Sequence, residues 1–185
     1  MATGATVYKA LIDISDLDRN YYGSHSLTVA RHPSETEERL MLRILAFCCH
    51  AGEHLEFGRG LSTQGEPALW EMAPTGEIHH WIEVGCADVK QVRRACGKSE
   101  MVTIMAYDDD RIEPWWASNK GEFSKLDKLS VITVSNELLE KLVKYVKRNM
   151  RLSVTIQDNI IWLSDDSGSL QIEFQTLKHR NQGVY

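Results

Sequence analysis

Residues 65–98 read GEPALWEMAPTGEIHHWIEVGCADVKQVRRACGK, and the rest of the chain is organised around them. An apolar run follows Pro67, a Pro-Thr-Gly sequence at 74–76 provides a tight turn, and a second run covers 78–84. Two β-rich runs joined by such a turn are typical of a β-hairpin. The pattern therefore predicts two neighbouring strands, and we expect the chemistry of the protein at their ends.

Polar residues follow the second strand of this hairpin. Glu83 lies at its carboxyl end, Gly85 stops the run, and a basic segment follows at helical spacing. The bases of that segment are Lys90, Arg93, Arg94 and Lys98. An acid at a strand end with bases on the next helix is how an α/β sheet assembles a polar site in its crevice.

The composition limits the class of protein. The chain has 185 residues, 43% hydrophobic and 25% charged, which is typical of one folded domain. Its net charge of −5 means that any nucleic-acid contact needs a local basic patch. Adjacent Cys48 and Cys49 suit buried thiols better than disulfides, and no apolar run approaches the ~20 residues of a membrane span. We expect a single domain, residues 1–185, that is cytoplasmic and has no membrane partner.

Three helices are predicted to flank the sheet, over 35–50, 88–95 and 136–149. The first follows Ser34, which forms a predicted capping box with Glu37. Apolar residues recur at helical spacing in the first and third of these segments, so each helix has one face to bury.

Strands are predicted on both sides of the hairpin. Their ranges are 6–14, 24–30, 55–57, 101–107, 129–134, 151–156, 160–163 and 170–174. We therefore predict an α/β (α+β) fold with one mixed sheet and β-hairpins added at its N- and C-terminal ends. The unbroken apolar character of Trp81-Ile82 and Val84 places strand 78–84 in the sheet interior. Residues 114–116 are expected in a loop or a short helix.

Several strings of residues resemble the YaeQ family of small bacterial proteins over almost the whole chain. They are YKA at 8–10, DLDRN at 16–20, ARHPSET at 30–36, ER at 38–39, WIEVG at 81–85, TIQD at 155–158 and IWLSDD at 161–166, with the basic residues of 90–95. That family is assigned to the PD-(D/E)XK nuclease-like superfamily. The predicted helix-strand-strand-strand-helix-strand order in the middle of the chain also resembles the superfamily core. The resemblance therefore implies a restriction-endonuclease-like αβββαβ core.

The nuclease motif has a physical logic. Two carboxylates from adjacent strands hold a divalent metal, which activates a water, and a lysine stabilises the charge that builds on the phosphate. Here Pro67-Ala68 stands where the resemblance puts Pro-Asp, and Glu83-Val84-Gly85 stands in the (D/E)-x-K place. Glu83 therefore keeps the second acid, whereas Ala68 lacks the first acid and Gly85 lacks the lysine.

Neighbouring residues are candidates to replace the missing groups. Glu71 is an odd number of residues from position 68 and should face away, whereas Glu66 shares its face. The missing cation could come from Arg93 or from its neighbours on the same helix. The candidate catalytic residues are Glu83, Arg94 and Lys90, the candidate Mg²⁺ ligands are Glu66 and Glu83, and Glu38 resembles an acid that some of these nucleases place beside the metal.

Each signal also has a structural interpretation. Glu83 either binds a metal or forms a partly buried ion pair with Arg94, and the helix bases either contact phosphate or form a solvated face. Two functions therefore stay open. One is a metal-dependent nuclease or nucleic-acid-processing phosphodiesterase. The other is a binding or regulatory protein that keeps the nuclease fold without its chemistry, and two replaced motif positions favour it. Nucleic acid is the expected partner, through a local basic patch.

Overall fold

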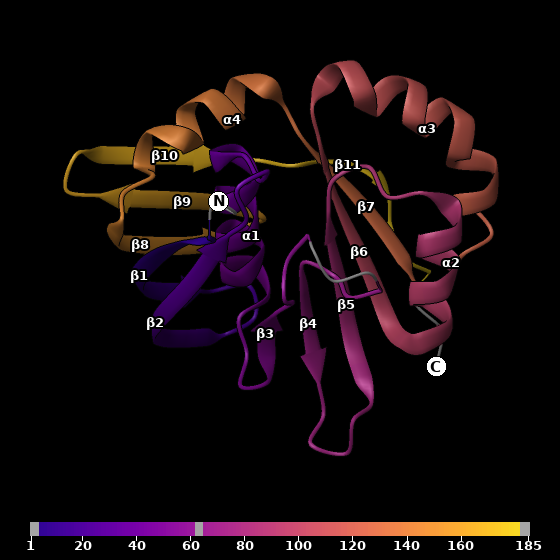
Figure 1. Cartoon of the computed structure of the whole chain (residues 1–185), viewed down its shortest axis with the longest axis horizontal. Coiled ribbons are helices and arrows are strands. Elements are labelled where there is room, and N and C mark those ends of the chain that lie inside the picture. The colour runs from indigo at the N-terminus through magenta and orange to yellow at the C-terminus, as the bar shows by residue number, and fades with distance from the viewer. Residues whose placement is uncertain (1–3, 62–64, 182–185) are drawn as a thin grey trace. The chain divides into compact units, whose positions relative to one another are not determined.

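The protein, seen here in a computed structural model, has two β-sheets in two compact units (Figure 1). The structure describes residues 4–61 and 65–181. The five-stranded unit contains residues 4–50, 60–61 and 137–173. The six-stranded unit contains residues 51–59, 65–136 and 174–181.

The five-stranded sheet has the strand order β10-β9-β8-β1-β2. Its strands are β1 (Thr6–Asp16), β2 (Tyr21–Arg31), β8 (Asn149–Gln157), β9 (Ile160–Asp165) and β10 (Gly168–Ile172). β1 pairs antiparallel with β2 and parallel with β8, where Lys9 stands opposite Asn149. The predicted hairpins at the two ends of the chain form, β1 with β2 and β8 with β9, but they share a second sheet, so the prediction of one sheet was wrong. Alternating hydrophobicity indicates which face of a strand is buried, but it does not indicate which strand pairs with it. The pairing of β1 with β8 joins segments far apart in the chain.

Helix α1 (Glu37–His50) lies against the inner face of this sheet. The ring of Phe47 meets His25 of β2 edge-on at 5.1 Å, and the Tyr8 hydroxyl of β1 donates to Glu37. The sheet contributes alternate buried side chains: Tyr8, Ala10, Ile12, Ile14, Met150, Leu152, Val154, Ile156, Ile161 and Leu163. This face agrees with the alternation predicted for residues 6–14.

The N-terminus of α1 is capped by Thr36, and the predicted Ser34 cap was wrong. The Thr36 hydroxyl accepts the backbone N–H of Arg39, three residues on, as an N-cap does. The Ser34 hydroxyl is instead 2.6 Å from Nδ1 of His32.

The predicted helix 136–149 is shorter than expected. α4 (Asn136–Leu142) is followed by one 3₁₀ turn, Val143–Tyr145, and the chain is extended at Val146. Lys147 then contacts Asp165 and Asp166, and Arg148 donates to the carbonyl of Val7. These contacts orient the chain toward β8. They end the helix, although the spacing of apolar residues in this segment predicted that it would continue.

The six-stranded sheet has the order β11-β7-β6-β5-β4-β3. Its strands are β3 (Leu55–Phe57), β4 (Leu69–Met72), β5 (Ile78–Val84), β6 (Ser99–Tyr107), β7 (Leu129–Val134) and β11 (Gln175–Lys178). β5, β6 and β7 run parallel, and β4 returns antiparallel beside β5. The prediction that strand 78–84 lies in the sheet interior is confirmed. β11 was not predicted.

Helices α2 (Val89–Lys98) and α3 (Asp109–Phe123) cover one face of this sheet. α2 begins with a capping box between Asp88 and Gln91. α3 has 15 residues, where the sequence predicted a loop or short helix around Pro114. α3 tolerates Pro114 because the apolar side chains of the helix pack on the sheet. The core they join contains Trp81, Val92, Ala95, Val102, Ile104, Ala106, Phe123, Leu129 and Val131.

In the described residues, two mixed sheets and four α-helices make a mixed α+β fold. The order of elements from α1 through β3, β4, β5 and α2 to β6 agrees with the predicted order. None of the helices in the described part of the chain has the length and apolar character to cross a membrane.

All four cysteines are free thiols, as expected from their spacing. Cys48 is fully buried, and burial raises the pKa of the neighbouring Cys49 to about 12. Neither thiol is therefore a thiolate at neutral pH, and both act as small apolar residues.

Candidate functional site

The predicted hairpin is formed by β4 and β5, with Leu69 opposite Ile82 and Trp70 opposite Trp81. The two indoles meet edge-on at 6.0 Å on the face that α2 and α3 cover. One further step along this register places Ala68, which is buried, beside Glu83. The two motif positions are therefore neighbours, but only one of them carries a carboxylate.

The carboxylate of Glu83 is bound by an indole. Nε1–H of Trp81 donates to Oε1 of Glu83 at 2.8 Å, from the same face of the same strand. This hydrogen bond therefore occupies one acceptor site of the carboxylate. Neither predicted interpretation of Glu83, the metal ligand or the ion pair with Arg94, included this donor.

Glu66 is engaged by Arg59. The backbone N–H of Arg59 donates to Oε2 of Glu66 at 3.1 Å, and its guanidinium lies 3.4 Å from Oε1. The adjacent loop fits closely here, because a Cβ on Gly58 would lie 2.0 Å from the carbonyl oxygen of Pro67. Glu66, the second candidate metal ligand, thus forms an ion pair with Arg59.

Gly85, at the motif lysine position, has a left-handed backbone with φ of 120°. Its N–H donates to the carbonyl of Met105 on β6 at 2.9 Å, which holds this conformation. A lysine there would be strained, since residues with a Cβ rarely adopt this φ. The backbone conformation at position 85 therefore favours glycine over the motif lysine.

The bases of α2 divide into two groups. Arg93 forms an ion pair with Glu122 of α3, which also binds Lys125. Lys125 first, and Arg93 next, lower the pKa of the Glu122 carboxyl. The other bases, Lys90, Arg94 and Lys98, are exposed and follow one another at four-residue spacing.

This exposed row, the α2 stripe (Lys90, Arg94 and Lys98), lies along one face of the helix because residues four apart share a face. It is about 12 Å long. Arg94 occupies its centre, where a Cβ on Gly65 would lie 3.4 Å from both terminal guanidinium nitrogens. The structure thus places Arg94 beside the loop that leads to Glu66.

Glu38, the remaining candidate, lies in the first turn of α1 in the five-stranded unit, where it is half-buried. Within residues 4–61 and 65–181, no three His, Cys, Asp or Glu side chains are grouped closely enough to hold a metal ion.

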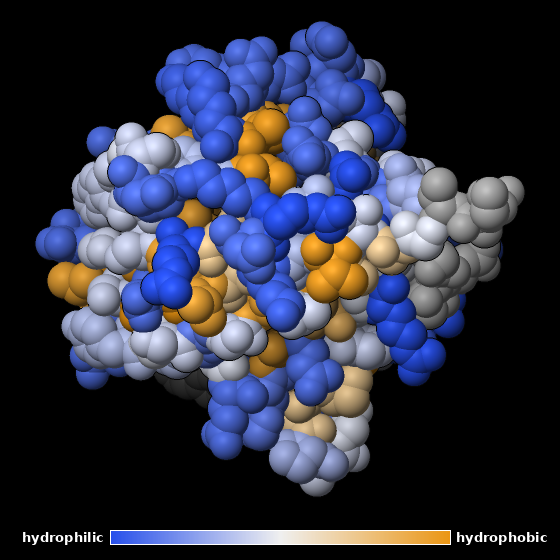
Figure 2. All heavy atoms as spheres, turned by 60° about the vertical axis from the view of Figure 1, so that its left-hand side comes forward, coloured by the Kyte–Doolittle hydropathy of each residue, from blue (hydrophilic) through white to orange (hydrophobic). Residues whose placement is uncertain are grey.

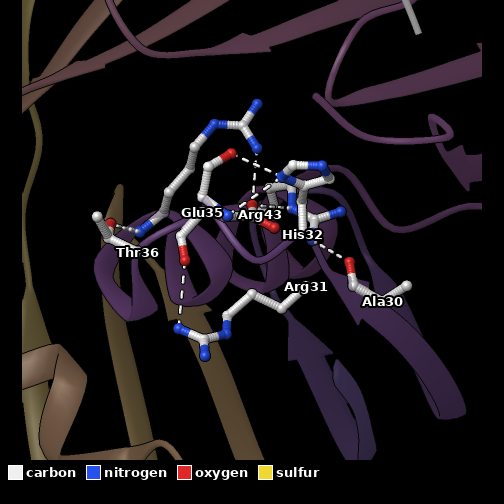
Figure 3. Close-up of polar contacts among 8 residues, drawn as sticks. Ala30, Arg31, His32, Glu35, Thr36 and Arg43 are labelled. Atoms are coloured by element: carbon white, nitrogen blue, oxygen red, sulfur yellow. Dashed lines mark hydrogen bonds and ion pairs between the residues drawn. The ribbon is translucent and has the colours of Figure 1, made fainter. Parts of the chain in front are cut away.

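A buried ionic cluster that the sequence did not predict joins the residue before α1's first turn to α1 itself (Figure 3). Glu35 and Arg43 are 3% and 2% exposed. Oε1 of Glu35 lies 2.7 Å from Nη1 of Arg39 and 2.8 Å from Nε of Arg43. Arg43 also donates to the carbonyl of Ala30, and Arg31 to that of Glu35.

Burial lowers the pKa of Arg43, and Glu35 opposes that shift. The cluster fastens the end of β2 to α1, so its role is structural. The four-residue spacing of Glu35, Arg39 and Arg43 is the signal in the sequence that could have indicated it.

The family model described as YaeQ protein matches residues 1–174. An uncharacterized protein YaeQ of Escherichia coli K12 is 42% identical over 172 residues, which cover 93% of this chain and 95% of the relative. Two crystal structures are similar. The YaeQ protein of Xanthomonas axonopodis pv. citri has a TM-score of 0.91 at 40% identity, over 96% of this chain and 99% of that one. The YaeQ protein of Pseudomonas syringae has a TM-score of 0.90 at 36% identity, over 95% and 97%.

Proposed function

Since the chain belongs to the YaeQ family, we propose that it is a non-catalytic nucleic-acid-binding protein with a nuclease-like αβββαβ core. The order of elements from α1 to β6 supports that core. The side chains at the motif positions support the loss of its chemistry. This proposal decides between the two functions that the sequence left open.

The observation that carries the proposal is the hydrogen bond from Trp81 to Glu83. A catalytic carboxylate needs its oxygens for the metal, whereas here one oxygen accepts an indole N–H in a half-buried setting. Mg²⁺ keeps several waters and usually binds one or two carboxylates plus substrate phosphates. Glu66 is paired with Arg59, Trp81 occupies one acceptor site of Glu83, and among the described residues no three His, Cys, Asp or Glu side chains are grouped to hold a metal ion. As they stand, these residues do not fit a Mg²⁺ site.

Gly85 supports the same conclusion. The motif lysine would be a rigid donor on the β5 strand, but the backbone at 85 favours glycine. Arg94 would have to act from α2, through a long and flexible side chain whose guanidinium is a fork rather than a point charge. Losing one fixed donor typically costs about two to three decades in rate.

The α2 stripe is the proposed binding surface. Its three cations extend over about 12 Å, and each strand of a nucleic acid carries one charge about every 3.4 Å. Such a stripe therefore faces about three to four phosphates. The capping box fixes the start of α2, and the Arg93–Glu122 ion pair fixes its orientation against α3.

The test is fluorescence anisotropy with short single-stranded DNA and RNA over a series of salt concentrations. The triple variant Lys90→Gln, Arg94→Gln and Lys98→Gln should lower affinity uniformly across sequences. It should also reduce the slope of log K against log[salt] by about two, because three phosphate contacts are lost.

The matched control replaces three exposed lysines elsewhere with glutamine, Lys120, Lys141 and Lys144, and changes the net charge equally. It should keep the affinity of the wild type. Equal loss in both triple variants would indicate a general charge effect and contradict the α2 stripe. Wild-type protein that binds neither single-stranded DNA nor RNA at low salt would contradict the proposed nucleic-acid binding.

A further inference from the structure

The outer face of the five-stranded sheet, turned away from α1, carries a groove of about 440 Å³. It lies over the neighbouring strands β1 and β8. Seen from the side of the five-stranded unit, hydrophilic residues dominate the surface and hydrophobic ones form separate patches (Figure 2).

The charges in this groove do not balance. Its lining includes Lys9, Lys147 and Arg151 and the acid Asp166, and Asp165 pairs with Lys147 beside it, which leaves a net charge of +1 for these five groups in a chain of −5. Lys147 lies 2.7 Å from Asp165 and 2.9 Å from Asp166. Hydrogen bonds to these two carboxylates raise its pKa to about 12.

Lys9 and Arg151 carry the surplus. Both are exposed, and neither has an ion-pair partner among residues 4–61 and 65–181. The parallel register places Lys9 beside Asn149 and Leu11 beside Arg151, so the two cations are diagonal neighbours on one face. A guanidinium fork and an ammonium point charge at this spacing suit one anion with several oxygens.

We propose that this groove binds a small-molecule phosphomonoester. A phosphomonoester carries a charge of about −1.5 to −2 at neutral pH, which complements the net charge of the groove. Asn149 and Ser26 add hydrogen-bonding groups beside the cations. Leu11, which is 46% exposed, provides an apolar wall for the organic part. The volume falls within the range of about 300–1,000 Å³ of small-molecule sites.

This inference is independent of the proposed nucleic-acid contact, because all its residues lie in the five-stranded unit. The alternative to ligand binding is that Lys9 and Arg151 are ordinary solvated cations. The experiment below distinguishes the two.

The test uses amide chemical shifts and isothermal titration calorimetry of the full chain with glycerol 3-phosphate, inorganic phosphate and glycerol. Glycerol 3-phosphate should shift the amides of Leu11, Ser26 and Arg151 in a saturable way, inorganic phosphate more weakly, and glycerol not at all. Arg151→Gln and Lys9→Gln should each weaken binding about tenfold, or about 1.4 kcal/mol. Asp166→Asn should strengthen it several-fold, because it removes a negative charge from the groove lining.

Arg111→Gln is the matched control, since Arg111 is exposed and lies on α3 in the other unit. It should leave the affinity for glycerol 3-phosphate unchanged. All these side chains are exposed, so the variants should fold, which their amide spectra will show. Shifts that spread over the whole surface without saturating would overturn the proposal. So would equal weakening by Arg111→Gln and Arg151→Gln.

Discussion

At the scale of single residues, the sequence predicted candidate site residues but not the partners that their side chains have in the structure. Glu83 was expected to bind a metal or Arg94, yet its carboxylate accepts from Trp81. The signal was present, because residues two apart on a strand share a face. The Glu66–Arg59 contact could not be predicted, since it depends on the path of the loop between β3 and β4.

Removing Arg43 should destabilise the protein strongly. Arg43→Met leaves the buried carboxylate of Glu35 with Arg39 alone, and breaking a buried pair costs about 3–5 kcal/mol. Urea denaturation measures the loss. The double variant Arg43→Met with Glu35→Gln should lose less than the sum of the single losses, because the two side chains interact. A loss below about 1 kcal/mol in Arg43→Met would contradict the structural role given to the cluster.

Ala68→Asp should create a metal site if the core is nuclease-like. Position 68 is buried beside Glu83, so a second carboxylate should destabilise the metal-free protein by about 1–3 kcal/mol. Adding Mn²⁺ should recover that stability in thermal unfolding, because a metal bound between the two acids neutralises their repulsion. Ala68→Asn is the control and should not respond to Mn²⁺. An unresponsive Ala68→Asp variant would argue against the nuclease-like geometry of β4 and β5.

At the scale of elements, local patterns predicted the helices and strands best where each has one buried face. α1, α2 and β5 were expected close to their observed ranges. α3 was missed because Pro114 disfavours a helix locally, while Trp115, Trp116 and Phe123 pack on the sheet and stabilise it. α4 was predicted too long because contacts of Lys147 and Arg148, distant in sequence, end it.

The cap of α1 gives a test at this scale. Thr36→Ala should lower the free energy of unfolding by about 1 kcal/mol, since it removes the acceptor for the N–H of Arg39. Ser34→Ala, two residues earlier and exposed, is the matched control and should cost less. Chemical denaturation of both variants measures the difference. A larger loss in Ser34→Ala would restore the capping box that the sequence first suggested.

At the scale of the whole molecule, the sequence indicated the class of fold but not its division into two sheets. Strand alternation predicted nearly every strand, yet the pairing of β1 with β8 depends on residues at opposite ends of the chain. The resemblance to the YaeQ family, by contrast, rests on strings spread over most of the chain, and the comparisons confirm it. The function of the protein follows neither from strand alternation nor from the family resemblance. It depends on whether the motif carboxylates are available, which is a property of side-chain contacts.

The measurement that tests this account most directly is a cleavage assay. Purified protein is incubated with supercoiled DNA, single-stranded DNA and RNA in the presence of Mg²⁺ or Mn²⁺. The wild type, Glu83→Gln and Arg94→Ala should all leave the substrates intact, because Glu83 is bound to Trp81 and position 85 cannot carry the motif lysine without strain. Cleavage by the wild type that disappears in both Glu83→Gln and Arg94→Ala would contradict the non-catalytic function.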